Sequence, residues 1–97
     1  MRDIARIEKW AHERNLIDGS TRQAQLCKLM EEVGELATAI NKNRPADVVD
    51  AIGDCAVVLT ILAAQSMTTL EACIDKAYYE IKDRKGRMID GIFVREE

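Results

Sequence analysis

The fold is decided by residues 48–64, VVDAIGDCAVVLTILAA, which are apolar on almost every side of a helix. Pro45 precedes this stretch and suits the first turn of a helix, because the N–H that it lacks would be unpaired there. We therefore expect a helix from Pro45 to about Gln65. A helix that is apolar all round has to be buried all round, and three other short helices can hardly enclose it. The sequence predicts that another copy covers it, in a homodimer or a dimer of dimers.

Two helices are expected ahead of this one, because hydrophobic residues recur there at helical spacing. The first runs from about Asp3, as its N-cap, to Arg14. The second begins near Ser20 or Thr21 and ends within residues 41–44. It carries an apolar stripe opposite its acidic residues, which makes the stripe its expected buried side: Leu26, Leu29, Met30, Val33, Leu36, Ala37 and Ile40.

A fourth helix is expected to begin at Thr68 or Thr69 and to end near Lys85. Residues 88–97 are expected to form an extended arm. The sequence therefore predicts an all-α fold, in which residues 1–97 form a single four-helix domain with a C-terminal arm and assemble as an oligomerising helical bundle.

Length and composition exclude several classes of function. A chain of 97 residues is too short to be expected to enclose a large active-site cleft of its own. The net charge of -3 and the 4% aromatic content disfavour a nucleic-acid-binding protein. The three cysteines are far apart and form no Cys-x-x-Cys pair, which favours a reducing cytoplasm over a disulfide framework. The longest apolar run, residues 55–64, is too short to cross a membrane.

Three glutamates of the second helix lie at spacings that make them neighbours on one surface. Glu31 and Glu35 are four residues apart, and Glu32 and Glu35 are three apart. On this helix alone, a simple solvated face explains them well.

The third helix favours a site instead. Asp47, Asp50 and Asp54 share one narrow stripe, which Val58 and Ile61 continue. Carboxylates on a partly buried line are costly unless basic side chains or a cation neutralise them. The sequence therefore predicts a charged partner for these aspartates.

Each acidic cluster also contains a glycine, Gly34 or Gly53, which allows close approach of two backbones. We expect the two helices to cross near these glycines and to gather four carboxylates: Glu32, Glu35, Asp50 and Asp54. An all-oxygen cage of this kind suits Mg²⁺ or Mn²⁺. A di-iron bundle is disfavoured, because it needs two Glu-x-x-His motifs and the single histidine is His12.

Three segments resemble a known family: Lys28–Leu36 (KLMEEVGEL), Asp50–Asp54 (DAIGD) and Glu80–Met88 (EIKDRKGRM). Together they resemble the MazG-like, all-α nucleoside triphosphate pyrophosphohydrolases, particularly the short single-domain forms of phages and bacteria. The resemblance extends from Ile7 to Val94.

The family's mark is Glu-Glu-x-x-Glu on one helix and Glu-x-x-Asp on the next. Glu31, Glu32 and Glu35 match the first motif in full. The second motif is half matched, because Asp54 fits but Ala51 stands where the family has Glu. Asp50 is one residue earlier, and we expect it to take the role of the missing ligand.

The resemblance implies Mg²⁺-dependent cleavage of (d)NTPs between the α and β phosphates, giving (d)NMP and pyrophosphate, with Mn²⁺ as a substitute metal. The metal ligands are then Glu32, Glu35, Asp50 and Asp54. Glu31 is the candidate for orienting or deprotonating the attacking water, or for binding a second metal. The chemistry agrees, since triphosphate hydrolysis needs charge neutralisation and an oriented water but no covalent nucleophile.

The substrate's phosphates need cations, and four of them lie close together after the fourth helix. The candidates for substrate binding are Lys82, Arg84, Lys85 and Arg87, with Lys28 one turn before Glu32. For each basic residue of the fourth helix, a favourable interaction with the helix C-terminus is an equally good explanation. Trp10 is a candidate for base stacking, although a lone Trp on an amphipathic stripe more often belongs to the core.

Ala51 keeps a second function open, a catalytically inert helical module that oligomerises and binds nucleotide or a partner protein. A nucleic-acid binder that uses the basic run is a weaker alternative, given the overall acidity.

Overall fold

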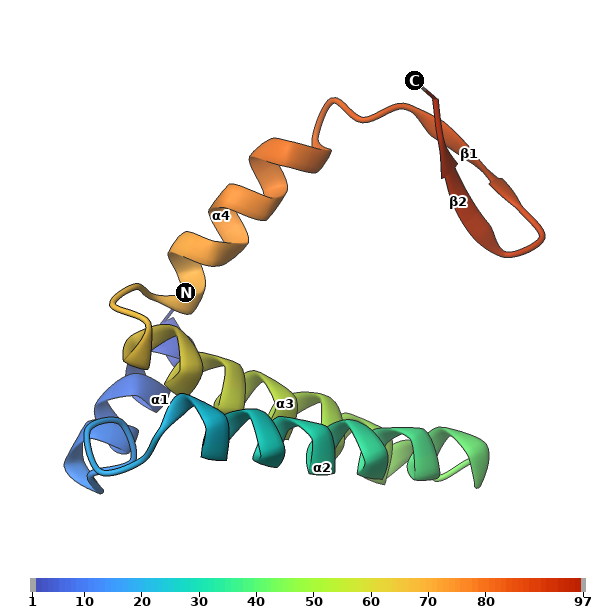
Figure 1. The fold of residues 1–97 in the computed structure, drawn as a ribbon. Helices are drawn as coiled ribbons and strands as arrows, with labels where there is room; N and C mark the ends of the chain where they lie inside the picture. Colours follow the sequence, from blue (N-terminus) through green and yellow to red (C-terminus); the bar gives the residue numbers. More distant parts are fainter. Residues whose placement is uncertain (1, 97) are drawn as a thin grey trace.

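Four helices and a short β-hairpin make up residues 2–96, the part of the chain that the computed structural model describes. In chain order they are α1 (Arg2–Glu13), α2 (Arg22–Asn41), α3 (Pro45–Gln65), α4 (Leu70–Ile81), β1 (Gly86–Ile89) and β2 (Ile92–Arg95). The helices α2 and α3 lie side by side along their length, α1 packs against α3, and α4 leads away from the end of α3 towards the hairpin (Figure 1). The predicted all-α class is confirmed.

The helix starts follow from local chemistry. Thr21 and Thr69 cap α2 and α4, because each hydroxyl accepts a hydrogen bond from the backbone N–H three residues later, at 3.0 and 3.1 Å. Pro45 is the first residue of α3, as expected. The prediction that Asp3 caps α1 is wrong, since the helix already includes Arg2 and the Asp3 carboxylate pairs with Arg6.

The contact between α2 and α3 uses the side of α2 that the hydrophobic pattern did not indicate. Glu32 and Ala39 are the buried residues of α2, at 5% and 4% exposure. Ala51 and Val58 are buried on α3. Much of the expected core stripe of α2 is exposed instead, including Leu26, Met30, Val33 and Ile40. The expectation that this stripe is the helix's buried side is therefore wrong within a single chain.

The hydrophobic core within the chain is small and lies at one end of the helix pair. Ala11, Ile17 and Ile61 form it, and Leu16, Val57 and Ala64 pack against it. Nearby, the Gln65 side-chain amide donates to the Ile17 carbonyl at 3.2 Å. This cluster fixes α1 and the following turn to the C-terminal half of α3, but it leaves Val49 and Ile52 of the N-terminal half exposed. The expected open face of α3 is thus present.

The C-terminal part differs from a simple arm. The helix α4 ends at Ile81, four residues before the expected Lys85. The strands then pair antiparallel, with Gly86 opposite Arg95 and Ile89 opposite Ile92. Asp90 and Gly91 form the turn between them, both with positive φ, as a two-residue hairpin turn requires. The Asp-Gly pair between hydrophobic residues was the sequence signal for this hairpin. None of the helices in residues 2–96 combines the length and the apolar character needed to cross a membrane.

Candidate metal centre

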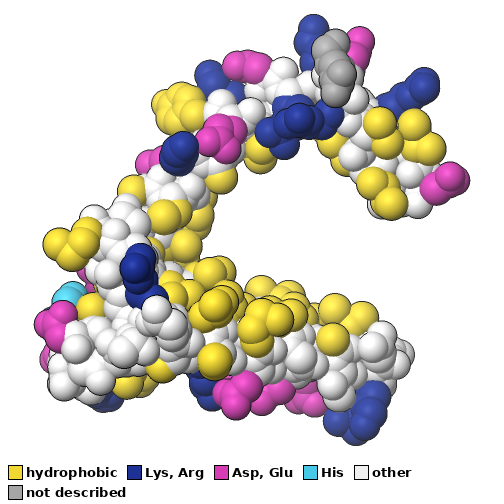
Figure 2. Space-filling view, viewed as in Figure 1, with side chains coloured by type: hydrophobic (Ala, Val, Ile, Leu, Met, Phe, Trp, Pro, Cys, Tyr) yellow, Lys and Arg dark blue, Asp and Glu magenta, His cyan; other side chains and the backbone are white. Residues whose placement is uncertain are grey.

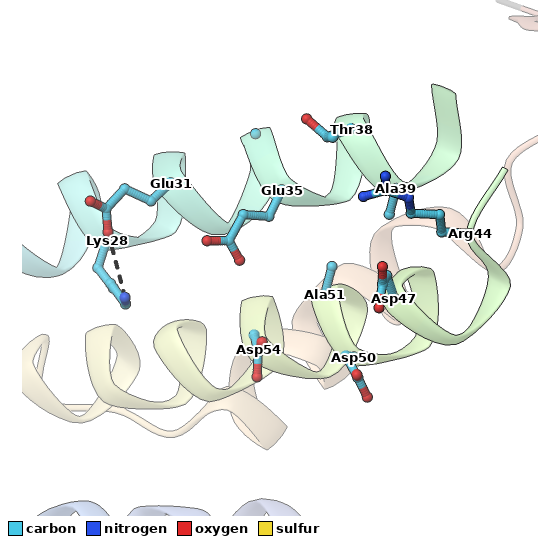
Figure 3. Close-up of a pocket in the computed structure, with 11 residues that line it drawn as sticks. Lys28, Glu31, Glu35, Thr38, Ala39, Arg44, Asp47, Asp50, Ala51 and Asp54 are labelled. Atoms are coloured by element: carbon cyan, nitrogen blue, oxygen red, sulfur yellow. Dashed lines mark ion pairs between the residues drawn. The ribbon is translucent and has the colours of Figure 1, made fainter. Parts of the chain in front are cut away.

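Three carboxylates meet between α2 and α3. Glu32 and Glu35 come from α2 and Asp54 from α3, and one oxygen atom of each lies within 4.8 Å of the others. In Figure 3 the side chain of Glu35 extends from α2 towards the side of α3 that carries Asp54. Opposite oxygen ligands of Mg²⁺ are about 4.2 Å apart, so small side-chain rotations would bring these oxygens to coordinating positions. The predicted gathering of Glu32, Glu35 and Asp54 around one point is confirmed.

Glu32 is buried, and only one of its oxygens has a partner. Its Oε1 lies 3.3 Å from the Lys28 Nζ, whereas its Oε2 has no hydrogen-bond partner among the described residues. Lys28 also lies 3.5 Å from the Oε2 of Glu31, the ion pair drawn in Figure 3. Hydrogen bonding to Glu32 and the charge of Glu31 raise the pKa of Lys28. A buried carboxylate oxygen without a partner is costly, and a bound cation would satisfy it.

The electrostatics at Glu35 also favour a cation. The negative charge of the neighbouring Glu32 raises the pKa of Glu35 above the usual 4.5, and burial and the charge of Asp54 add to this effect. Lys28 opposes the shift but does not cancel it. Three carboxylates that repel one another, with oxygen as the only ligand atom, fit a hard divalent cation such as Mg²⁺.

Asp50 does not join this cluster. It lines the same groove, but its side chain is directed away from α2, whereas Ala51 points towards α2 (Figure 3). The reason is helical geometry, because Ala51 lies about 20° from the buried Val58 around the helix axis, whereas Asp50 lies about 80° from Val58, on the far side of Asp54. The structure therefore does not bring Asp50 to the position of the missing ligand. Ala51, which stands where the family has Glu, places only a methyl group on the side of α3 that faces α2.

The expected close crossing at the glycines is wrong. A Cβ atom added to Gly34 or Gly53 would meet no heavy atom within 4 Å. The small residues that are buried between α2 and α3 are Ala39 and Ala51. Alanine allows the two helices to approach without the loss of helix propensity that glycine causes.

Glu35 and Asp54 line an open groove of about 950 Å³ between the two helices, whereas the buried Glu32 does not line it. Arg44, Asp47 and Thr38 also line the groove. None of the three was among the predicted site residues, although Asp47 was placed on the stripe of Asp50 and Asp54. Lys28 and Arg44 are the basic residues that line the groove. Arg44 directly precedes α3, in the short connection that joins the two acidic helices. This position next to both helices was the sequence signal that could have indicated Arg44 as a residue of the groove.

The other predicted substrate-binding residues lie elsewhere in the chain. Lys82, Arg84, Lys85 and Arg87 follow α4 and are exposed, and none of them lines the groove. Arg84 and Lys85 line a separate depression together with Arg95. A single chain therefore does not bring this basic run to its own carboxylates.

Trp10 lies on α1 and does not line the groove either. The residue is 42% exposed, and the Arg14 guanidinium lies 4.7 Å from the ring centroid. The prediction that Trp10 belongs to the core of the chain is wrong, because Ala11 occupies the buried position beside it.

Two adjacent helices that direct three carboxylates to one point define an all-α protein with a groove suited to a divalent cation. Residues 20–88 match the family model described as the MazG nucleotide pyrophosphohydrolase domain. The match covers more than half of the chain, and the chain therefore belongs to this family. Membership implies a pyrophosphohydrolase, which is a hydrolase of acid anhydrides, and the acidic cluster agrees with the metal dependence typical of the family.

An uncharacterized 18.2 kDa protein in the rep-hol intergenic region of Haemophilus phage HP1 is similar to this chain. The two sequences are 54% identical over 63 residues, which cover 65% of this chain and 39% of the phage protein. The alignment thus spans about two fifths of the relative's length. No solved structure matches the chain.

Proposed function

We propose that the chain is a Mg²⁺-dependent pyrophosphohydrolase that cleaves (d)NTPs between the α and β phosphates. The observation that carries the proposal is the carboxylate cluster of Glu32, Glu35 and Asp54. Glu35 and Asp54 line an open groove, and the buried Glu32 beside them has one oxygen without a hydrogen-bond partner among the described residues. Family membership supports the reaction class. The groove volume of about 950 Å³ lies within the range of small-molecule sites.

Glu32, Glu35 and Asp54 would hold the metal ion, which Mn²⁺ can replace. When bound, the ion neutralises charge on the triphosphate and lowers the pKa of water. The chain's own task is then to position the substrate and the water. Hydrolysis of this kind needs no covalent nucleophile, and the groove needs only to hold the phosphates in line with the attacking water.

Two kinds of side chain are placed to do this. Lys28 and Arg44 line the groove and would bind phosphate oxygens through their N–H groups. Glu31 is exposed beside Lys28 and would orient the attacking water, accepting its proton on a carboxylate oxygen. The basic run Lys82, Arg84, Lys85 and Arg87 would reach a substrate only in a partner copy's groove, because it does not line its own. Trp10 has no supporting contact for base stacking.

The test is pyrophosphate release from a panel of NTPs and dNTPs in the presence of Mg²⁺. We expect Glu35→Gln and Asp54→Asn to lower turnover by about 100-fold or more, because each removes a charge from the metal site. Glu13→Gln is the matched control, since Glu13 is an exposed carboxylate at the end of α1. Helical content by circular dichroism should stay that of the wild type in all three variants.

A catalytically inert nucleotide-binding module is the alternative, and Ala51 at the fourth cluster position favours it. In that case a non-hydrolysable nucleotide would bind, but no nucleotide of the panel would release pyrophosphate at any metal concentration. Full activity of Glu35→Gln or Asp54→Asn would show that the metal site is wrongly placed.

A further inference from the structure

Arg44 is a groove residue whose position in the chain is locally unfavourable. It is the N-cap of α3, and its side chain makes no capping hydrogen bond. Ser, Thr, Asp and Asn are favoured at an N-cap, because their oxygens accept hydrogen bonds from backbone N–H groups that the helix leaves unpaired. A positive charge is also unfavourable beside the positive end of the helix dipole. Arg44 therefore lowers the stability of the start of α3.

The two basic residues of the groove differ in how they are held. The Nζ of Lys28 lies 3.3 Å from Glu32 and 3.5 Å from Glu31, so its charge is already offset. The guanidinium of Arg44 has neither a hydrogen bond nor an ion pair in the part of the chain that the structure describes. Asp47 lines the groove as well, in the first turn of α3, but it is not paired with Arg44. Arg44 thus keeps all its N–H donors available to a ligand.

The side chain of Arg44 reaches along the groove. In Figure 3 it extends from the connection between α2 and α3 back towards Ala39 of α2. Glu31 lies towards the other end of the groove, and the carboxylates of Glu35 and Asp54 lie between the two (Figure 3). A ligand that is held at these carboxylates therefore has Glu31 on one side and Arg44 on the other.

The charge of the groove indicates what kind of ligand Arg44 can receive. Five acidic and two basic residues line it, which is a net charge of -3. A free triphosphate would be repelled, so its charge has to be offset in part by a cation at the carboxylates. Such an offset is limited to the phosphates beside the carboxylates. The rest of the chain of phosphates needs a further positive charge, and a guanidinium binds phosphate oxygens in pairs.

The distance between Arg44 and the carboxylates fits more than one phosphate. Arg44 precedes Asp54 by ten residues, which corresponds to about 15 Å along a helix, and an extended arginine side chain spans roughly half of that distance. The remaining gap is longer than a single phosphate group and comparable to a short polyphosphate chain. Arg44 is therefore placed for the far end of a triphosphate whose near end lies at Glu35 and Asp54.

We propose that Arg44 binds the β and γ phosphates, the part of the substrate that leaves as pyrophosphate. This assignment rests on the proposed function and adds to it the direction in which the substrate lies. The oxygen of the attacking water forms a bond to the α phosphorus, while the bond from this phosphorus to the oxygen that bridges it to the β phosphorus breaks.

The two ends of the groove then have separate tasks. Glu31 accepts the proton of the water, and the bridging oxygen keeps the electron pair of the broken bond as part of pyrophosphate. The N–H groups of Arg44 stabilise the charge that pyrophosphate gains. Because Glu31 and Arg44 lie on opposite sides of the carboxylates, water and leaving group are on opposite sides of the α phosphorus, as in-line displacement requires (Figure 3).

Calorimetric titration tests the assignment without turnover. The ligands are inorganic pyrophosphate, the α,β-methylene analogues of the dNTPs, and the dNMPs, each with excess Mg²⁺. Arg44→Gln should weaken binding of pyrophosphate and of the analogues by about 10- to 100-fold, because it removes a charged, paired donor, and should leave dNMP binding unchanged. Lys42→Gln is the matched control and should bind every ligand as the wild type, since Lys42 lies in the same connection but is not among the residues that line the groove.

Arg44→Gln is expected to fold, because arginine is a poor N-cap, and circular dichroism checks this. Arg44→Lys keeps the charge without the paired donors and should recover only part of the pyrophosphate affinity. The assignment alone is wrong if the wild type releases pyrophosphate from a dNTP but Arg44→Gln binds pyrophosphate as tightly as the wild type, or loses dNMP affinity to the same extent. A wild type that binds none of the ligands and releases no pyrophosphate would overturn the proposed function and the assignment with it.

Discussion

The carboxylate of Glu32 is buried in the contact between α2 and α3, where an apolar side chain would avoid the cost of burying a polar group. Lys28 neutralises one of its oxygens at 3.3 Å, and the other has no hydrogen-bond partner within residues 2–96. Burying a half-paired carboxylate costs free energy, which a bound cation would offset. A metal ligand is the role that fits this position.

Lys28 would compete for Glu32 with the proposed metal ion. Lys28→Met should tighten binding of Mn²⁺ several-fold in the absence of nucleotide, because it removes a positive charge from the site. The same change should lower the midpoint of thermal unfolding of the metal-free protein, since Glu32 loses its counter-charge. Calorimetric titration and thermal denaturation measure the two effects.

Lys76→Met is the control for Lys28→Met, because Lys76 pairs with Glu80 at 3.2 Å with the same spacing on an exposed helix surface. It should change neither the metal affinity nor, appreciably, the unfolding midpoint. Unchanged Mn²⁺ binding by Lys28→Met would contradict the competition.

Ala51 allows a second test of the cluster, in which a carboxylate is added. It is buried at 5% exposure, points towards α2 and shares the face of Asp54. Ala51→Glu should place a fourth carboxylate at the cluster and tighten metal binding by about 10-fold, at the expense of metal-free stability. Ala51→Gln adds the same volume without the charge and should not tighten binding. Equal metal affinities of the two variants would rule out this position as a vacant ligand site.

At the scale of single elements, α2 and α3 form from strong local signals but meet through small residues. Thr21 and Pro45 set their starts, and Ala39 and Ala51 lie in their contact. Gly34 and Gly53 stand in open space. Their cost in helix propensity is therefore not offset by a close approach within the chain.

Substitution of Gly53 measures this cost. Gly53→Ala should raise the free energy of unfolding by about 0.5–1 kcal/mol in urea denaturation, because alanine has the higher helix propensity and its Cβ meets nothing. Gly91→Ala is the contrasting variant, since Gly91 has a φ of +80° in the hairpin turn, and it should destabilise the hairpin. A loss of stability in Gly53→Ala would mean that a second copy approaches α3 at this residue.

At the scale of the whole molecule, acidic and hydrophobic side chains gather on opposite sides of the pair formed by α2 and α3 (Figure 2). This separation lets one side assemble while the other stays open to a metal and a substrate. The small core around Ala11, Ile17 and Ile61 joins α1 and the following turn to α3, but the hairpin contributes no buried residue. Much of the folding free energy is therefore expected to come from association.

That expectation has a thermal consequence. The unfolding midpoint of the wild type should rise steadily over a roughly hundredfold increase in protein concentration, because dissociation accompanies unfolding. Differential scanning fluorimetry at several concentrations measures it. Met30→Glu should lose this concentration dependence, because it places a charge on the exposed apolar stripe of α2. Met67→Glu should keep it, because Met67 lies in the connection between α3 and α4. A midpoint that is independent of concentration in the wild type would indicate that the isolated chain is stable by itself.

The residues of the sequence by themselves determined the helices and most of the carboxylate cluster. Capping hydroxyls, Pro45 and the period of the hydrophobic residues are local signals, which is why the bounds of α2 and α3 could be predicted. The spacing of Glu32 and Glu35 and the stripe through Asp54 and Val58 likewise follow from helical geometry, and they indicated the three carboxylates that meet.

Only the tertiary structure decided which side of each helix faces its neighbour. The periodicity of α2 defined an apolar and an acidic side, but the chain packs the acidic side against α3 and leaves the stripe with Met30 exposed. Periodicity identifies the surface that has to be buried without saying whether the same chain or another copy buries it. In the same way, the rotational position of α3 against α2 turns Ala51 towards α2 and Asp50 away from it (Figure 3). Sequence spacing does not specify that position.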